Sequence, residues 1–200
     1  MSGRRAKVIL LGGSSHAGKS SVAAVLAARL GWEARSTDYL ARHPGRPWPV
    51  GDRPVPPHVV EYYRDLSDAA RMDSVLAHYR RLAPQIVEIV RAHLAPAAPG
   101  LVFEGSALLP ETVAEVLGPG VAAFWVTADP ALVARRMQRE SGHAAADAEA
   151  RALIDAFLRR SLDFDRLFAD EARAAGLSVL RVVDGETVEA AAERVLALTA

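Results

Sequence analysis

The fold of this chain is decided by the stretch VILLGGSSHAGKSS at residues 8–21. Its apolar run of four residues stops at glycine, and from Lys19 onward apolar side chains recur at the spacing of an amphipathic helix. A buried strand, a glycine-rich turn and a helix are therefore expected in immediate succession. From Gly13 to Ser20 the turn has the spacing glycine, four residues, then Gly-Lys-Ser.

The chemistry of this turn is that of a phosphate cradle, the P-loop. Glycine enters the required backbone dihedrals cheaply and lets an oxygen atom approach closely, so the backbone N–H groups can turn inward. The positive end of the following helix adds to their attraction for phosphate. Lys19 is predicted to reach the β- and γ-phosphates, and the Ser20 hydroxyl to be one ligand of Mg²⁺. The predicted cofactor-binding residues here are Gly13, Ser14, Ser15, His16, Ala17, Gly18, Lys19, Ser20 and Ser21; His16 has no separate role.

Composition limits the function classes. The chain has 200 residues with 50% hydrophobic content, enough for one domain with a real core. Lysine plus arginine (24) balances aspartate plus glutamate (24), so no global field favours nucleic acid or membrane. The absence of cysteine excludes disulfides, thiolate zinc sites and a cysteine nucleophile. The basic N-terminus precedes too short an apolar run for a signal peptide or membrane span. We expect a cytoplasmic protein with no nucleic-acid or membrane partner, and leave its oligomeric state open.

Downstream, apolar periodicity alternates between strand-like and helix-like segments. Strands are expected at 32–37, 101–103, 121–127 and 178–183, and helices at 58–66, 67–94, 110–117, 130–140, 147–175 and 186–198. Pro84 should bend the second of these helices or split it in two. Such alternation predicts a parallel sheet with helices on both faces.

A proline-rich stretch from His43 to Pro57 interrupts this pattern and excludes regular helix or central strand there. Arg42, His43, Arg46 and Trp48 within it are unusual for a linker, which is normally small and polar. Cations beside an aromatic ring suit an anionic or ring-bearing substrate. Loop packing is an equally open role for each of them.

Beyond the loop, the chain resembles the P-loop small-molecule and nucleoside-monophosphate kinases. Glu104-Gly105 resembles their acidic-glycine pair at the end of the third strand, and residues 104–110 are similar to the corresponding stretch of 2-phosphoglycerate kinases. Asp129 followed by Arg135 and Arg139 resembles the approach to the adenylate kinase lid.

Two further segments carry the same resemblance. Val183-Asp184-Gly185 is similar to the adenine-side segment of these kinases, which implies cofactor-binding roles for Asp184 and Gly185. Asp38 after the second strand looks like the acceptor-side aspartate of shikimate-type and chloramphenicol-phosphotransferase-type kinases. The usual nucleoside-monophosphate pattern is absent here, as is the Asn-Lys-x-Asp guanine motif, so ATP is the expected donor.

The resemblance implies an α/β fold, a P-loop three-layer sandwich whose five-stranded parallel sheet has the order 2-3-1-4-5. It further implies one domain over residues 1–200, with a substrate-side insertion at about 39–95 and a mobile lid at about 136–150. The implied cofactors are ATP and Mg²⁺, and the implied partner is a small-molecule phosphoryl acceptor.

Each candidate residue has an ordinary alternative. Asp38 is predicted to orient or deprotonate the acceptor hydroxyl, because the carboxyl ends of strands face the ligand crevice; it could instead cap a turn. Glu104, with Gly105 beside it on the substrate side, is predicted to hold Mg²⁺ through water; it could instead accept a hydrogen bond from a loop. Arg135 and Arg139 share a helix face and are predicted to clamp phosphates, although helix arginines are often plain surface residues.

These features predict an ATP-dependent phosphotransferase that moves the γ-phosphoryl group to a hydroxyl or phosphate of a small metabolite. The alternative is a P-loop protein that binds nucleotide as a sensor or regulatory module without an acceptor. The sequence leaves open which acceptor is used, and whether Asp38 or Glu104 is the base.

Overall fold

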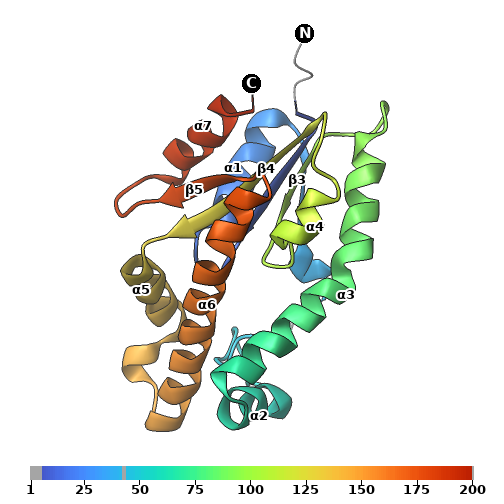
Figure 1. The fold of residues 1–200 in the computed structure, drawn as a ribbon. Helices are drawn as coiled ribbons and strands as arrows, with labels where there is room; N and C mark the ends of the chain where they lie inside the picture. Colours follow the sequence, from blue (N-terminus) through green and yellow to red (C-terminus); the bar gives the residue numbers. More distant parts are fainter. Residues whose placement is uncertain (1–5, 42–43, 200) are drawn as a thin grey trace.

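A computed structural model describes residues 6–41 and 44–199, and its centre is a five-stranded parallel sheet (Figure 1). The strands are β1 (Val8–Gly13), β2 (Glu33–Ser36), β3 (Leu101–Glu104), β4 (Val121–Ala128) and β5 (Ser178–Val182). Their order is β2-β3-β1-β4-β5, and every neighbouring pair is parallel. The predicted fold class and strand order are confirmed.

Helices cover both faces of this sheet. Successive residues of a strand point to opposite faces, so each strand contributes side chains to a core on either side. On one face, Ile9 and Leu11 of β1 pack in a core with α1 (Lys19–Leu30) and α7 (Val188–Ala197). On the other face, Leu10 of β1 packs in a second core with α3 (Asp68–Leu94), α4 (Pro110–Ala114) and α6 (Ala148–Ala174). The sheet is thus the middle of three layers.

The helix boundaries follow local chemistry. Ser67, Asp129 and Asp147 each accept a hydrogen bond from a backbone N–H of the first turn, at α3, α5 (Pro130–Ser141) and α6 respectively. Gly31 ends α1 with a φ of 64°, a left-handed conformation that favours glycine. Both predicted caps, Asp129 and Asp147, are confirmed.

Of the two outcomes expected at Pro84, α3 shows the bend and not the split. The helix continues from Asp68 to Leu94 and bends at mid-length in Figure 1. Buried side chains lie on both sides of the proline, Leu76 before it and Ile86 after it, in one core. Their packing keeps the helix intact although proline removes a backbone hydrogen bond.

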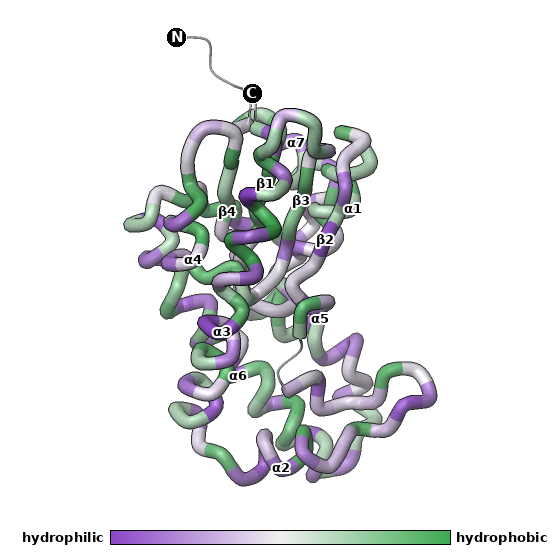
Figure 2. Tube along the Cα trace, turned by 90° about the vertical axis from the view of Figure 1, so that its right-hand side faces the viewer, coloured by the Kyte–Doolittle hydropathy of each residue, from purple (hydrophilic) through white to green (hydrophobic). Residues whose placement is uncertain are grey.

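Beyond the sheet, the N-terminal parts of α3 and α6 meet α2 (Pro57–Asp65) and α5 at the end of the molecule opposite the chain termini (Figure 1). In Figure 2 the helices at this end alternate between hydrophilic and hydrophobic residues, as two-sided helices do. Trp48 and Phe157 pack here in a T-shaped contact with ring centroids 5.0 Å apart. Within residues 6–41 and 44–199, no helix is long and apolar enough to cross a membrane.

Candidate nucleotide and acceptor site

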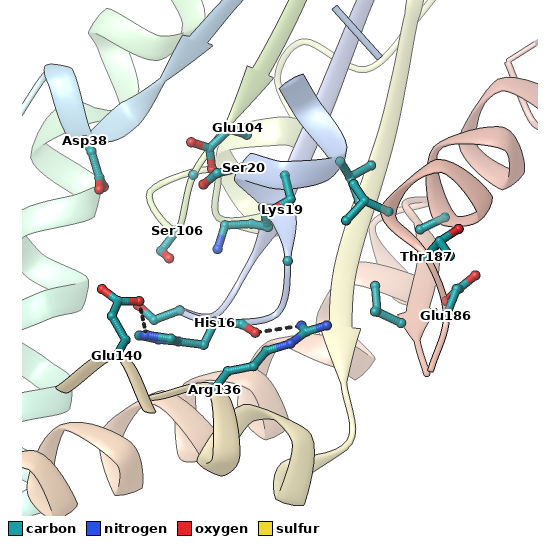
Figure 3. Close-up of a pocket in the computed structure, with 18 of the residues that line it drawn as sticks. His16, Lys19, Ser20, Asp38, Glu104, Ser106, Arg136, Glu140, Glu186 and Thr187 are labelled. Atoms are coloured by element: carbon teal, nitrogen blue, oxygen red, sulfur yellow. Dashed lines mark hydrogen bonds and ion pairs between the residues drawn. The ribbon is translucent and has the colours of Figure 1, made fainter. Parts of the chain in front are cut away.

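A polar cavity of about 450 Å³ lies where the carboxyl ends of β1, β2 and β3 meet. The P-loop forms its floor, and side chains from α5, the β5–α7 segment and the end of β3 form its walls (Figure 3). Ligands of open parallel sheets bind outside the carboxyl ends of the strands. Predicted site residues that line it are Ser15, His16, Gly18, Lys19, Ser20, Ser21, Asp38, Arg46, Glu104 and Gly105.

The P-loop backbone has the conformation that its glycines allow. Gly13 has a φ of 135°, and a Cβ there would lie 2.1 Å from the carbonyl oxygen of Val126. Gly18, with a φ of 107°, precedes the first residue of α1, so the positive end of that helix faces the cavity. Ser14 and Ala17, also predicted to bind the cofactor, are buried and do not line this cavity.

Lys19 is buried against its own loop, where its Nζ donates a hydrogen bond to the Ser14 carbonyl oxygen at 2.5 Å. Burial lowers the pKa of Lys19, and the nearby carboxylates of Glu104 and Asp38 oppose this effect. A bound polyphosphate would place further negative charge beside the buried Lys19 ammonium and favour its charged form.

His16 has a left-handed backbone conformation with a φ of 63°, which is uncommon for a residue other than glycine. Its side chain is only 6% exposed and lies against the rings of Trp48 and Phe157. Its Nε2 is 3.0 Å from Oε2 of Glu140 on α5. Burial lowers the pKa of His16 and favours the neutral ring; because a carboxylate only accepts, Nε2 is the nitrogen that donates.

Asp38 and Glu104 are brought to the same cavity by a close backbone approach (Figure 3). Asp38 lies in the short 3₁₀ turn η1 (Thr37–Tyr39) after β2, and Glu104 is the last residue of β3. Gly105 has a φ of 150°, and a Cβ there would fall 1.8 Å from Oγ1 of Thr37. Only glycine allows the two strand ends to approach this closely.

The two predicted arginines of α5 do not line the cavity in this structure. Arg135 forms an ion pair with Asp184 at 2.7 Å, Arg139 is exposed, and neither lines the cavity. Arg136 and Glu140 line it instead, and Nη1 of Arg136 donates to the His16 carbonyl oxygen at 3.1 Å. Both pairs have the spacing of one helix face, but each residue turns the helix by about 100°. The predicted pair therefore lies one position away from the face that meets the P-loop.

The adenine-side prediction is displaced in a similar way. Asp184 and Gly185 do not line the cavity, whereas Glu186 and Thr187, which follow them, do. The Glu186 carboxylate is held by Nη1 of Arg194 at 2.9 Å and by the backbone N–H of Val183 at 3.2 Å. The segment that follows β5 therefore lines the cavity through Glu186 and Thr187, at its C-terminal end.

On the acceptor side, the structure separates the four predicted residues. Arg46 lines the cavity, as noted above. Trp48 is 4% exposed and belongs to the hydrophobic core, which corrects its predicted place in a substrate pocket. Arg42 and His43 lie outside the described residues.

A smaller cavity of about 70 Å³ adjoins the first, and Ser15, Asp38, Arg46 and Ser106 line both. Arg160 of α6 also lines it, although its side chain is buried. Its Nη1 donates to the Tyr63 hydroxyl at 2.8 Å, and its guanidinium lies 4.7 Å from the centroid of the Phe157 ring. Burial opposes the charge of Arg160, but the neighbouring phenols, Tyr63 foremost, raise its pKa. Within the described part of the chain, no carboxylate forms an ion pair with it.

Sequence patterns missed Tyr79, Ser106, Arg136 and Glu140, and they did not distinguish Arg160 from its neighbour Arg159 as a candidate. A signal for Arg160 did exist, because it lies three residues after Phe157 and four before Phe164, on the apolar face of its helix. A charged residue at such a position is buried and requires a partner.

The donor set fits Mg²⁺ held jointly with a nucleotide. Among residues 6–41 and 44–199, no group of three or more His, Asp or Glu side chains could hold a metal ion by itself. Ser20 and Glu104 face the cavity as one hydroxyl and one carboxylate (Figure 3). Mg²⁺ is commonly held by one or two protein oxygens together with phosphates and waters.

With this geometry the chain has the fold of the P-loop small-molecule kinases. It is similar to a sugar kinase from Janibacter sp. HTCC2649 (18% identity, TM-score 0.56, covering 96% of this chain and 93% of that one). It is also similar to a shikimate kinase from Acinetobacter baumannii in complex with shikimate (13% identity, TM-score 0.52, covering 98% of this chain and 92% of that one). A gluconokinase from Sinorhizobium meliloti 1021 is similar too (20% identity, TM-score 0.51, covering 98% of this chain and 94% of that one). No protein-family model and no curated protein sequence matches the chain. At these identities the likeness concerns the fold.

Proposed function

We propose that the chain is a Mg²⁺- and ATP-dependent phosphotransferase that moves the γ-phosphoryl group to a small metabolite. One observation carries the proposal: the Asp38 carboxylate lines both the P-loop cavity and the smaller cavity beside it. A nucleotide sensor needs the first cavity alone. A carboxylate at the junction of two cavities is where phosphoryl transfer needs a group to orient or deprotonate the acceptor hydroxyl.

The charges around the larger cavity support a metal requirement. Three cationic side chains line it against four carboxylates: Lys19, Arg46 and Arg136 against Asp38, Glu104, Glu140 and Glu186. The side chains alone therefore do not neutralise a triphosphate. Mg²⁺ bound with the nucleotide would supply the missing charge, and Ser20 and Glu104 are the residues that would hold it.

The roles of the other residues follow from their positions. Lys19 and the N-terminus of α1 bind the phosphates and stabilise the charge that develops on the leaving oxygen. Arg136 fixes the P-loop backbone through the His16 carbonyl oxygen and lies within reach of the phosphates. Asp38 accepts the proton of the acceptor hydroxyl as this oxygen attacks phosphorus.

The smaller cavity supports an anionic acceptor of modest size. Arg160 provides a buried positive charge there that donates to the Tyr63 hydroxyl and lies over the Tyr63 and Phe157 rings, so a carboxylate or phosphate of the substrate is expected to bind it. About 70 Å³ is too little for a nucleoside or a large antibiotic in this conformation.

We further propose that residues 39–95 form the acceptor side of a single domain and residues 136–150 its lid. Arg46 and Tyr79 of the first range line the acceptor cavity, and Arg136 and Glu140 of the second line the nucleotide cavity. Closure of the lid would exclude water from the transferring group.

The test is an ATP-consumption screen over a metabolite library, with the phosphorylated products identified by mass. The wild type is expected to phosphorylate at least one small anionic hydroxy compound, and Lys19→Ala none. Asp38→Asn is expected to lower turnover by about 10²- to 10⁴-fold while leaving MgADP affinity unchanged. Tight MgATP binding without product from any acceptor would favour the sensor, and full turnover by Asp38→Asn would remove Asp38 from the mechanism.

A further inference from the structure

Three segments that are distant in sequence meet at the Glu140 carboxylate. His16 of the P-loop contacts Oε2 at 3.0 Å, and Arg46 of the proline-rich segment forms an ion pair with Oε1. Glu140 itself is on α5 and lines the nucleotide cavity. The carboxylate therefore lies at the edge of the space where a triphosphate would bind.

The two partners of Glu140 differ in kind. Burial lowers the pKa of His16, with Arg46 and Lys19 lowering it further against the effect of Glu140, so a neutral ring donates the hydrogen bond. His16 also lies in a tight aromatic environment, whereas the Arg46 side chain is 39% exposed. His16 thus fixes the position of Glu140, and Arg46 supplies the opposite charge from a partly solvent-exposed position.

Arg46 is the arginine best placed to reach a transferring phosphoryl group. It lines both the nucleotide cavity and the acceptor cavity, so it lies at their junction. Arg136 lines the nucleotide cavity but not the acceptor cavity, and Arg160, which donates to Tyr63, lines the acceptor cavity but not the nucleotide cavity. Separating a partly exposed ion pair such as Arg46–Glu140 costs little, because such pairs contribute about 0–1 kcal/mol.

We propose that Arg46 is the cation that contacts the γ-phosphoryl group during transfer, and that Glu140, held in place by His16, competes with this phosphate for the Arg46 guanidinium. In this structure Arg46 forms its ion pair with Glu140. A γ-phosphate takes over the Nη1–H donor that Glu140 holds in this structure, and Glu140 keeps the hydrogen bond from His16 as its remaining partner. The planar guanidinium suits a tetrahedral phosphate oxygen pair better than an ammonium does. The inference rests on the proposed function only in requiring a triphosphate on the P-loop.

Competition of this kind gives opposite effects in two variants. Arg46→Ala is expected to weaken binding of the Mg²⁺ complex of AMPPNP, a non-hydrolysable triphosphate, by about tenfold, because a charge-assisted hydrogen bond is lost. Glu140→Gln is expected to tighten it by about threefold, because the competitor is gone. MgADP, which lacks the γ-phosphate, is expected to bind equally well to both variants. Arg46→Lys is expected to restore part of the AMPPNP affinity.

The measurement is isothermal titration calorimetry of the full chain with MgAMPPNP and MgADP. Arg53→Ala and Glu149→Gln are matched controls, since both residues are exposed and line neither cavity. In the double variant Arg46→Ala/Glu140→Gln, the tightening caused by Glu140→Gln is expected to disappear.

Two results would overturn the inference. If Arg46→Ala weakens MgADP and MgAMPPNP equally, Arg46 supports the fold of the site and does not contact the γ-phosphate. If Glu140→Gln tightens AMPPNP as much without Arg46 as with it, Glu140 acts by general repulsion. Both results concern nucleotide binding alone, so they are independent of whether the metabolite screen yields a product.

Discussion

Replacing Gly105 by alanine tests whether the end of β3 fixes the position of Asp38. A Cβ at residue 105 would lie 1.8 Å from Oγ1, 2.8 Å from Cβ and 2.9 Å from Cγ2 of Thr37. Rotation of the threonine side chain cannot relieve this overlap, because its Cβ is itself too close. Thr37 is 2% exposed and its Cβ position is set by the main chain, so the backbone of the 3₁₀ turn η1 must shift.

The size of the effect follows from this geometry. The new Cβ and Oγ1 of Thr37 must separate by about 1.2 Å to reach the 3.0 Å limit of real contacts. Asp38 is the next residue along the chain, and a misplacement of about 1 Å near the reacting atoms can cost about 10²-fold in rate. Overpacking typically costs about 1–3 kcal/mol, which corresponds to a fall in Tm of roughly 2–12 °C for a domain of this size.

Three measurements on Gly105→Ala distinguish this effect from general damage. Thermal unfolding gives the stability cost, calorimetry with MgADP reports the P-loop, and steady-state transfer to the acceptor found in the screen reports Asp38. We expect a lower Tm, nearly unchanged MgADP affinity and a transfer rate about 10²-fold lower. Gly118→Ala is the control, since a Cβ there has no neighbour within 4 Å. A Gly105→Ala variant with the Tm and transfer rate of this control would refute the reasoning.

Three further predictions concern single side chains. Arg160→Gln is expected to raise the KM for the acceptor by about 10- to 100-fold in steady-state kinetics, with MgADP affinity unchanged, because an anionic group loses its charged donor. Trp48→Ala is expected to lower the free energy of unfolding by about 3–5 kcal/mol in urea, because it removes a buried aromatic ring from the core. Burial lowers the pKa of His16, so the unfolded chain takes up its proton first; the free energy of unfolding should fall as the pH drops through about 6.5. His16→Asn should weaken that dependence in urea titrations at several pH values.

Most of the fold could be predicted because its boundaries depend on local chemistry. The signals for these boundaries act within a few residues of themselves. They are glycine with a positive φ, Pro130 in the first turn of α5, and the side-chain caps at Asp129 and Asp147. The P-loop is equally local, since one continuous segment builds it. Pro84 shows the limit, because the packing on both sides that keeps α3 continuous comes from residues far away in sequence.

The site was less predictable where it depends on how elements rotate against each other. The resemblance after Asp129 predicted that α5 faces the nucleotide, but spacing cannot tell whether Arg135 or Arg136 faces the P-loop, since this depends on how α5 packs. Trp48 is a residue type that is common in substrate contacts, and only its packing against Phe157 shows that it belongs to the hydrophobic core. The roles proposed for Asp38, Glu104 and Arg46 stay predictions until the variants are measured.

The two long helices constrain how substrates enter and leave. At 27 residues each, α3 and α6 are about 40 Å long, and both are anchored on the sheet at one end while carrying acceptor-side residues, Tyr79 and Arg160, further along. In α6, which has no proline and no break between Ala148 and Ala174, there is no hinge at which the Arg160 side of the acceptor cavity could swing away. Exchange of acceptor and product is therefore expected to proceed on the side of Arg46, whose partly exposed ion pair with Glu140 opens at little cost.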